Sequence, residues 1–251
     1  MKIVVIGGTG LIGSQLVRNL STLGHEVIAA SPSSGVNTIT GEGLSNVLRD
    51  AQVVVNVANS PSFEAKAVMD FFTKSEKNLL QAEKTAGVAH HVILSIVGVD
   101  RQGANPYFLA KLAQEQLVKD SGVPYSILHA TQFYEFVGGI AESGLIGNEI
   151  HVSPAIFQPI ASADVVDILT EIVVGPALNG TVEVAGPEKI GLDVIVRKYL
   201  ALKKDGRILV SDSTTGYFGA AVNDLTLIPG PNPIIGHQFY DDWVRVPGNL
   251  K

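Results

Sequence analysis

The chain has 251 residues, of which 46% are hydrophobic, so it can build one sizeable α/β domain or a main domain with a small appended one. Its formal net charge of -6 and the lack of any Lys/Arg block argue against nucleic acid as a direct partner. Cysteine is absent, which excludes disulfides, thiol nucleophiles and thiolate metal sites.

Apolar, β-branched runs alternate with helical patterns in the first half of the chain. Such runs are typical of parallel strands that are buried on both faces. The predicted strands are residues 2–7, 25–31, 51–59, 91–98 and 123–130, and the predicted helices are 11–24, 43–50, 63–87 and 107–122. This order predicts an α/β fold, a doubly wound and mostly parallel Rossmann sheet with right-handed crossovers.

The pattern changes after about residue 130. A helix at 162–175, a strand at 180–186 and a helix at 191–204 are still predicted, but Gly and Pro become frequent. We expect one Rossmann domain over 1–251, in which 131–160 and 205–251 form a small substrate lobe. Ligands of such folds bind beyond the carboxyl ends of the strands, so the lobe is expected to cover that edge.

The loop GGTGLIG follows the first predicted strand and opens the first helix, which is the context that a dinucleotide-binding loop requires. Gly7 permits the tight turn, Gly10 lets the backbone approach a pyrophosphate, and Gly13 lets helix and strand pack closely. The start of the helix then offers free N–H groups to the phosphates. The candidate cofactor residues of this loop are Gly7, Thr9, Gly10, Leu11, Ile12 and Gly13.

The end of the second strand should show which dinucleotide is bound. Residues 30–36 contain no acid for the ribose hydroxyls of NAD, and also none of the basic residues that usually hold the 2′-phosphate of NADP. Ser31, Ser33 and Ser34 can donate to that phosphate, which favours NADP(H) over NAD(H). The alternative is that these serines form an ordinary turn around Pro32.

Two tyrosines stand four residues before a lysine, which places each pair on one face of a helix. Tyr107 and Lys111 also have Ser95 twelve residues upstream of the tyrosine, near the end of a predicted strand. Nothing comparable precedes Tyr199 and Lys203, which we interpret as structural. Ser95, Tyr107 and Lys111 are therefore the candidate catalytic residues.

These three side chains suit a carbonyl–alcohol reaction. An ammonium beside a phenol is expected to lower the pKa of Tyr107 and to hold the nicotinamide ribose. Ser95 is expected to hydrogen-bond the substrate oxygen, while Tyr107 transfers a proton and the cofactor transfers hydride. The alternative is a tyrosine near a helix start and a solvated lysine.

The chain resembles the short-chain dehydrogenase/reductase superfamily, and within it the atypical, NmrA-like branch. The similar motifs are GGTGLIG at 7–13, VVVNVANSP at 53–61, HVILSIVGVD at 91–100, PYFLAKLAQE at 106–115 and GVPYSILHATQFYEF at 122–136. The resemblance implies a Rossmann fold with Ser95, Tyr107 and Lys111 in the catalytic positions. It also implies that Ala58, Asn59 and Ser60 line the cofactor.

The chain departs from this family at one motif. Relatives often carry Arg-Pro where this chain has His129 and Ala130, which leaves the contacts after that strand open. A fourth catalytic position, Asn in the larger superfamily, is not assigned. Some NmrA-like members bind dinucleotide as redox sensors without catalysis, but these commonly lack the Tyr/Lys pair.

Thr131, Phe133 and Tyr134 follow the end of a predicted strand and are the candidate substrate residues. They would form a mostly apolar, aromatic pocket wall, suited to a small carbonyl or quinone-like substrate. The alternative is that these aromatic residues form a structural core.

The sequence thus predicts an NAD(P)H-dependent oxidoreductase that interconverts a carbonyl and an alcohol. The alternatives are a dinucleotide-sensing regulator that binds a protein partner and an isomerase that uses the same cofactor. We expect a small-molecule substrate, no membrane or nucleic-acid partner and no metal, because the six histidines lack ligand spacing. With no signal peptide or membrane span in sight, a cytoplasmic location is expected, and a homo-oligomer is compatible.

Overall fold

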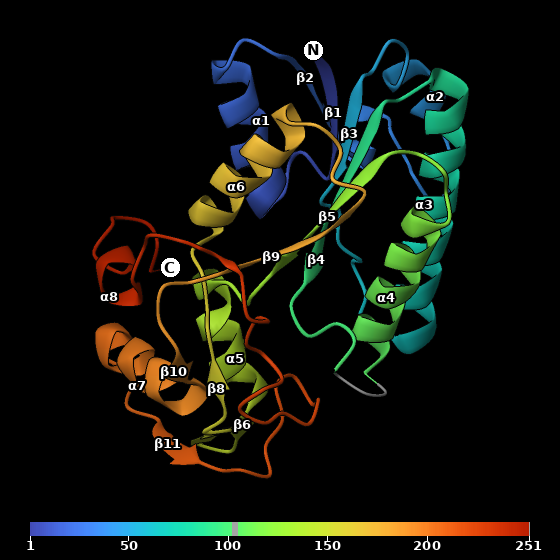
Figure 1. Ribbon diagram of the computed structural model, residues 1–251. Coiled ribbons are helices and arrows are strands. Elements are labelled where there is room, and N and C mark those ends of the chain that lie inside the picture. The colour runs from blue at the N-terminus through green and yellow to red at the C-terminus, as the bar shows by residue number, and fades with distance from the viewer. Residues whose placement is uncertain (102–104, 251) are drawn as a thin grey trace. The chain divides into compact units, whose positions relative to one another are not determined.

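The computed structural model describes residues 1–101 and 105–250 (Figure 1). Its central element is a seven-stranded sheet of order β12-β9-β5-β4-β3-β1-β2. The strands are β1 (Lys2–Ile6), β2 (Glu26–Ala30), β3 (Val53–Asn56), β4 (His90–Ile96), β5 (Tyr125–Ala130), β9 (Gly180–Ala185) and β12 (Ile234–Ile235). The α/β Rossmann fold predicted from the sequence is confirmed.

Helices cover both faces of this sheet in Figure 1. Helix α1 (Leu11–Thr22) and α6 (Ser162–Val174) lie on one face, and α3 (Ala65–Ala86) and α4 (Pro106–Lys119) lie on the other. A short helix, α2 (Leu44–Val47), and a 3-10 turn, η1 (Pro32–Ser34), complete the connections between the first strands. The core strand residues are fully buried because parallel strands between two helical layers meet no solvent.

The strand register brings several candidate residues to one edge of the sheet. Ile6 at the end of β1 pairs with Ala30 of β2 on one side and with Asn56 of β3 on the other, all in parallel. The glycine loop, the serines of η1 and the segment 57–60 therefore all begin at the carboxyl edge, where ligands of parallel sheets bind.

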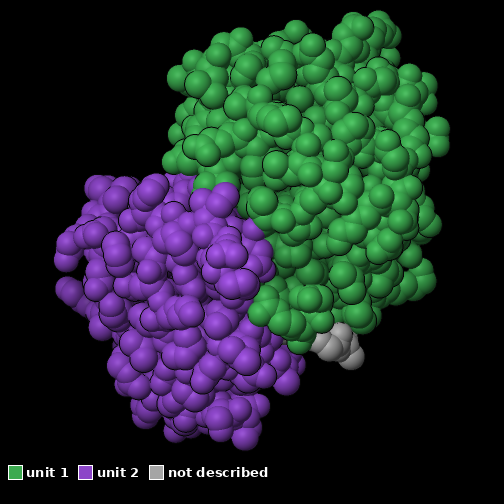
Figure 2. All heavy atoms as spheres, viewed as in Figure 1, with its two compact units in different colours: residues 1–129, 165–182 green, residues 130–164, 183–251 purple. Residues whose placement is uncertain are grey.

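The chain divides into two compact units, shown in different colours in Figure 2. Unit 1 contains residues 1–129 and 165–182, and unit 2 contains residues 130–164 and 183–251. The two segments predicted to form a substrate lobe, 131–160 and 205–251, fall in unit 2, which also includes 183–204. Whether these segments bind substrate stays a prediction.

Unit 2 is built from short elements around an aromatic core. Its helical segments are η2 (Tyr134–Phe136), α5 (Val137–Ser143), α7 (Leu192–Lys203) and α8 (Tyr240–Trp243). Strands β6 (Leu145–Ile146), β7 (Glu149–Val152) and β11 (Ile208–Ser211) form one small sheet, and β8 (Ile156–Phe157) pairs with β10 (Ile190–Gly191). Tyr134, Tyr240 and Trp243 lie in the core of this unit, where their rings pack on one another.

Candidate functional site

The glycine loop has the backbone geometry of a phosphate cradle. Gly7 has φ +81°, which favours glycine, and a Cβ on it would lie 2.8 Å from the Cα of Ala58. A Cβ on Gly13 would lie 2.2 Å from the Gly7 carbonyl oxygen, so α1 can pack this closely on the loop only through glycine. Gly10 is different, because its nearest protein atom would be 3.4 Å from a Cβ. Among the described residues, therefore, no contact requires glycine at position 10.

The start of α1 is open to a ligand. Gly10 is its N-cap and supplies no side-chain hydrogen bond to the first turn. The first N–H groups of a helix have no partner within the helix and favour an anion. Thr9, Gly10 and Leu11 are exposed here, whereas Ile12 and Gly13 are buried.

The three serines after β2 bond mainly to one another. Ser31 Oγ lies 2.8 Å from Ser33 Oγ, and Ser34 Oγ accepts a hydrogen bond of 2.9 Å from the Ser31 backbone N–H. This capping arrangement is the ordinary turn around Pro32 that was the alternative to phosphate binding. It also leaves Ser33 and Ser34 exposed, so a phosphate role for them stays a prediction.

The segment after β3 connects the loop with the candidate tyrosine. Asn56 Oδ1 accepts a hydrogen bond of 3.1 Å from the Ala58 N–H, and Ser60 Oγ donates to the Ser62 carbonyl over 2.7 Å. Asn59 Oδ1 accepts a hydrogen bond of 3.0 Å from the Tyr107 hydroxyl. The phenol is thus fixed to the residue that follows Ala58, against which Gly7 packs.

Tyr107 stands in the first turn of α4. Asn105 caps this helix by accepting from the N–H groups of Tyr107 and Phe108, and Pro106 occupies the first helical position. The tyrosine ring packs edge-on against Phe72, with 5.7 Å between ring centroids. The sequence Asn-Pro-Tyr therefore starts the helix and fixes the direction of the phenol.

The pKa of Tyr107 differs from the sequence-based expectation. Burial raises the pKa of the phenol to about 12, and the hydrogen bond to Asn59 opposes this only in part. The expected lowering by Lys111 is wrong for this structure, because the lysine has other partners. A phenol with so high a pKa is protonated near neutral pH, and it is a weaker acid than an ordinary tyrosine.

Lys111 is buried, with 4% of its surface exposed, and its side chain turns into unit 1. Its ammonium donates to the Leu94 carbonyl over 2.8 Å and to Gln114 Oε1 over 2.5 Å. It also lies 4.8 Å from the centre of the Phe72 ring. Burial lowers its pKa to about 8, although the charges of Glu76 and Glu115 oppose this.

Ser95 is bound to a carboxylate. Its Oγ donates to Glu115 Oε1 over 2.6 Å, and His129 Nε2 lies 2.8 Å from the same oxygen. Lys119 contacts the other oxygen at 3.2 Å. Burial alone would raise the pKa of Glu115, but His129, Ser95 and Lys119 lower it to about 2. His129 is thus a partner of Glu115.

A buried histidine lies between two carboxylates, one of which is linked through Gln114 to Lys111. His91 Nε2 is 3.0 Å from Glu76 Oε1, and His91 Nδ1 is 2.7 Å from Glu83 Oε1. Burial alone would lower the pKa of His91, but the two carboxylates outweigh it and raise the pKa to about 10. The spacing of the sequence does not indicate this cluster, since the glutamates are distant from His91 along the chain.

We expect this histidine to make stability fall as pH rises from about 6.5 to 8. The folded chain keeps a proton on His91, whose pKa is raised to about 10, whereas the unfolded chain releases it above the ordinary pKa of 6.5. One such proton corresponds to a loss of about 1.4 kcal/mol per pH unit. Above about pH 8 the lowered pKa of Lys111 opposes the trend.

Urea unfolding at several pH values in this window measures the slope. His91→Gln should remove most of it. His90→Gln should keep the slope above about pH 7.5, because His90 is uncharged there both in the folded chain, where burial lowers its pKa to about 4, and in the unfolded chain, where its pKa is 6.5. An equal slope in wild type and His91→Gln would contradict the assignment.

The candidate substrate residues lie in unit 2. Thr131 is 1% exposed and its hydroxyl has no hydrogen-bond partner among the described residues. Phe133 stacks on Phe136, with 5.5 Å between ring centroids. Tyr134 belongs to the core, and its hydroxyl donates to the Gln238 carbonyl over 3.0 Å.

Gln132 was missed by the sequence analysis. It is 6% exposed, and both polar atoms of its amide have no partner in the part of the chain that the structure describes. Buried amides are nearly always hydrogen-bonded, so this one is available to water or to a ligand. Its position between Thr131 and Phe133 was the only signal in the sequence.

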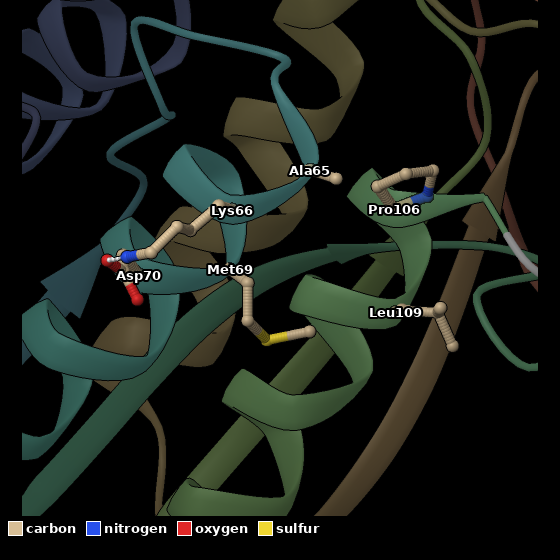
Figure 3. A pocket seen from close by; sticks show the side chains of 6 residues that line it. All are labelled: Ala65, Lys66, Met69, Asp70, Pro106 and Leu109. Atoms are coloured by element: carbon tan, nitrogen blue, oxygen red, sulfur yellow. Dashed lines mark hydrogen bonds and ion pairs between the residues drawn. The ribbon is translucent and has the colours of Figure 1, made fainter.

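A surface hollow of about 370 Å³ lies between the starts of α3 and α4 (Figure 3). It is lined by Ala65, Lys66, Met69, Asp70, Pro106 and Leu109. Figure 3 shows the Lys66 ammonium turned to Asp70, at 2.8 Å. Its lining includes neither the glycine loop nor the three candidate catalytic residues, so it is not the predicted cofactor site.

Comparison with known families decides the identity. Residues 7–174 match the model of a family described as NAD(P)H-binding. The chain belongs to this NAD(P)H-binding family. The matched range begins at Gly7 and contains Ser95, Tyr107 and Lys111. The resemblance to the short-chain dehydrogenase/reductase superfamily and its NmrA-like branch is confirmed.

The curated relatives of this NAD(P)H-binding protein include an assembly factor and a reductase. It is 27% identical over 161 residues to the photosystem II assembly factor Ycf39 of Cyanophora paradoxa, covering 59% of this chain and 48% of the relative. It is 27% identical over 224 residues to the chloroplastic divinyl chlorophyllide a 8-vinyl-reductase of Cucumis sativus, covering 75% and 53%. The chain spans about half the length of these relatives.

Solved structures support the fold. The dTDP-4-dehydrorhamnose reductase of Bacillus anthracis, solved in complex with NADP, matches with a TM-score of 0.76 at 18% identity, covering 97% of each chain. Among the described residues, no helix is both long and apolar enough to cross a membrane. Because some relatives are chloroplastic, the cytoplasmic location stays a prediction.

The residues of the loop fit the dinucleotide that the family binds. Gly7 and Gly13 leave no room for a side chain, which places the backbone of the loop close to the start of α1. Gly10 leaves room that a side chain would fill, and the first turn of α1 lacks a side-chain cap. This combination suits a pyrophosphate above Gly10.

Proposed function

We propose that this protein is an NAD(P)H-dependent oxidoreductase that interconverts a carbonyl and an alcohol on a small, mostly apolar substrate. The observation that carries the proposal is the bond of Tyr107 to Asn59. It ties a protonated phenol to the segment that packs against the glycine loop. The nicotinamide, when bound, would supply or accept the hydride.

Tyr107 is the proposed acid. Its raised pKa keeps the proton on the phenol until charge develops on the substrate oxygen. Asn59 Oδ1 also accepts from the Ser60 N–H at 2.9 Å, which fixes this acceptor beside the phenol. Because the hydroxyl has one proton, it must turn from Asn59 to donate to the substrate oxygen. In the reverse direction, the phenolate form of Tyr107 would accept the proton of the alcohol.

Lys111 and Ser95 have supporting roles in the proposal. The Lys111 ammonium is proposed to hold the nicotinamide ribose and to stabilise charge near Tyr107, after exchanging a protein acceptor for the ligand. Ser95 can bond a substrate oxygen only by sharing its hydrogen bond with Glu115. We therefore assign the larger share of proton transfer to Tyr107.

The substrate contacts are proposed to come from the segment after β5. Thr131 and Gln132 carry buried polar atoms without partners among the residues that the structure describes, which suits a substrate with one polar end. Phe133, stacked on Phe136, supplies an apolar wall. Tyr134 supports this wall from the core of unit 2.

We propose that the cofactor is NADP(H) rather than NAD(H), since no acid follows β2. Titration with NADPH and NADH, followed by a panel of carbonyls and quinones, tests this function. We expect tighter binding of NADPH and NADPH oxidation with at least one member of the panel. If neither NADPH nor NADH binds, the proposal is rejected.

A second candidate is a dinucleotide-sensing protein that binds a protein partner without catalysis. It is favoured by the similarity to a photosystem II assembly factor and by the inward turn of Lys111. Cofactor binding without turnover on any substrate of the panel would favour this candidate. A partner whose release depends on the NADPH/NADP+ ratio would support it directly.

A further inference from the structure

The buried side of Lys111 has a fixed chain of hydrogen bonds that the proposed chemistry does not use. Gln114 Oε1 accepts from the ammonium at 2.5 Å, while Gln114 Nε2 donates to Glu76 Oε2 at 2.6 Å. Asn56 Nδ2 donates to the same Glu76 oxygen at 2.9 Å. These hydrogen bonds thus run from a carboxylate on α3 through an amide on α4 to the Lys111 ammonium.

The direction of this chain is set by chemistry. An amide has donors on nitrogen only and acceptors on oxygen only, and a carboxylate can only accept. Because Glu76 takes the nitrogen end of Gln114, the oxygen end must face Lys111. Glu76 itself is held by His91, whose ring lies 3.0 Å from its other oxygen.

We propose that Glu76 and Gln114 are positioning residues for Lys111, which fix its ammonium between the Leu94 carbonyl and the Phe72 ring and keep it charged. The described residues contain no group of three His, Asp or Glu side chains that could hold a metal ion, so the cluster is an ion-pair network. The catalytic role of Lys111 rests on the proposed function. The position of its ammonium does not, because it follows from the contacts described above.

Among the described residues, the groups that face the Lys111 ammonium come from β4, α3 and α4. These are the Leu94 carbonyl of β4, the Phe72 ring and Glu76 of α3, and Gln114 and Glu115 of α4. Burial opposes the charge, and the two carboxylates favour it. Removing the charge of Glu76 should therefore release the proton of Lys111 at lower pH.

Glu76→Gln tests the inference, and Glu83→Gln is the matched control. Both replace a fully buried carboxylate of α3 that contacts His91, but only Glu76 bonds to Gln114. The readout is the titration of the Lys111 side chain by NMR with 13C-labelled lysine, its signal assigned with Lys111→Arg. We expect the titration midpoint of Lys111 to fall by about one pH unit in Glu76→Gln, which is a tenfold change in its protonation ratio. In Glu83→Gln the midpoint should be the same as in wild type.

Turnover against pH is the second readout. The loss of activity at high pH should move to lower pH in Glu76→Gln and stay in place in Glu83→Gln. If the NMR midpoint falls in Glu76→Gln but neither wild type nor any variant turns over a substrate, the positioning role holds and the proposed function fails. If wild type turns over and both variants keep its midpoint and profile, the positioning role is rejected.

Gln114→Leu keeps the test decisive if Glu76→Gln does not fold. It removes the amide link and leaves the contact of Glu76 with His91. Its control is Gln116→Leu on the same helix, where the amide bonds only to exposed Asp120. The Lys111 midpoint should fall in the first variant alone, and equal midpoints in both would reject the chain of contacts.

Discussion

Replacing Tyr107 with phenylalanine is expected to reduce turnover by roughly 10²- to 10⁴-fold, the range that one acid–base group contributes. Phenylalanine keeps the ring between Phe72 and Phe63, whose centroids lie 5.7 and 5.8 Å away, and removes only the hydroxyl that donates to Asn59. NADPH affinity should therefore change little. The measurements are kcat on an accepted substrate, the Kd for NADPH and the thermal unfolding midpoint.

The chain contains its own control for this experiment. Tyr199 stands four residues before Lys203 in α7, with the same spacing as the candidate pair, but it packs against the core of unit 2. Tyr199→Phe should leave turnover unchanged. If Tyr107→Phe keeps its rate as well, Tyr107 is not the acid and the non-catalytic candidate gains support.

The first half of the fold could be predicted because its signals are local. Continuous apolar runs between helical patterns identify parallel strands, and each of the five predicted strands overlaps an observed one. The turn at Gly7 and the helix start after Gly10 are also local, since backbone freedom and helix capping depend on neighbouring residues.

Unit 2 could not be predicted in the same detail. Strands β6, β8, β10 and β12 have two residues each, too few to show any periodicity. Their pairing joins distant segments, as where Ile190 faces Phe157. The aromatic core that holds Tyr134 likewise includes Trp243 from the end of the chain. Such contacts depend on tertiary packing rather than on local pattern.

The candidate site depends on contacts between distant segments that sequence spacing does not show. Helical spacing places Tyr107 and Lys111 on one face, but it does not show that Glu76, from another helix, and the Leu94 carbonyl, from a strand, surround the ammonium. The direction of the Tyr107 pKa was wrong for the same reason, because burial outweighs a neighbour with other partners. Ser95 was assigned from its strand end, while its partner Glu115 lies on α4.

Gly10→Ala is expected to weaken NADPH binding by roughly 100-fold, or about 2.7 kcal/mol, while leaving the fold intact. The φ of -80° at this position suits any residue, and the nearest protein atom would lie 3.4 Å from the new Cβ. The added methyl group would instead occupy the space above the first turn of α1, where we propose that the pyrophosphate lies. Calorimetric titration gives the affinity, and urea unfolding gives the stability.

Gly13→Ala separates a ligand effect from a packing effect. Its Cβ would lie 2.2 Å from the Gly7 carbonyl oxygen, so the helix must shift, at a cost of about 1–3 kcal/mol typical of overpacking. Both variants should lose NADPH affinity, but only Gly13→Ala should lose stability. Unchanged affinity in a folded Gly10→Ala protein would mean that the ligand does not approach this backbone. A dinucleotide would then have to bind elsewhere, and the role of Tyr107 beside the nicotinamide would lose its geometric basis.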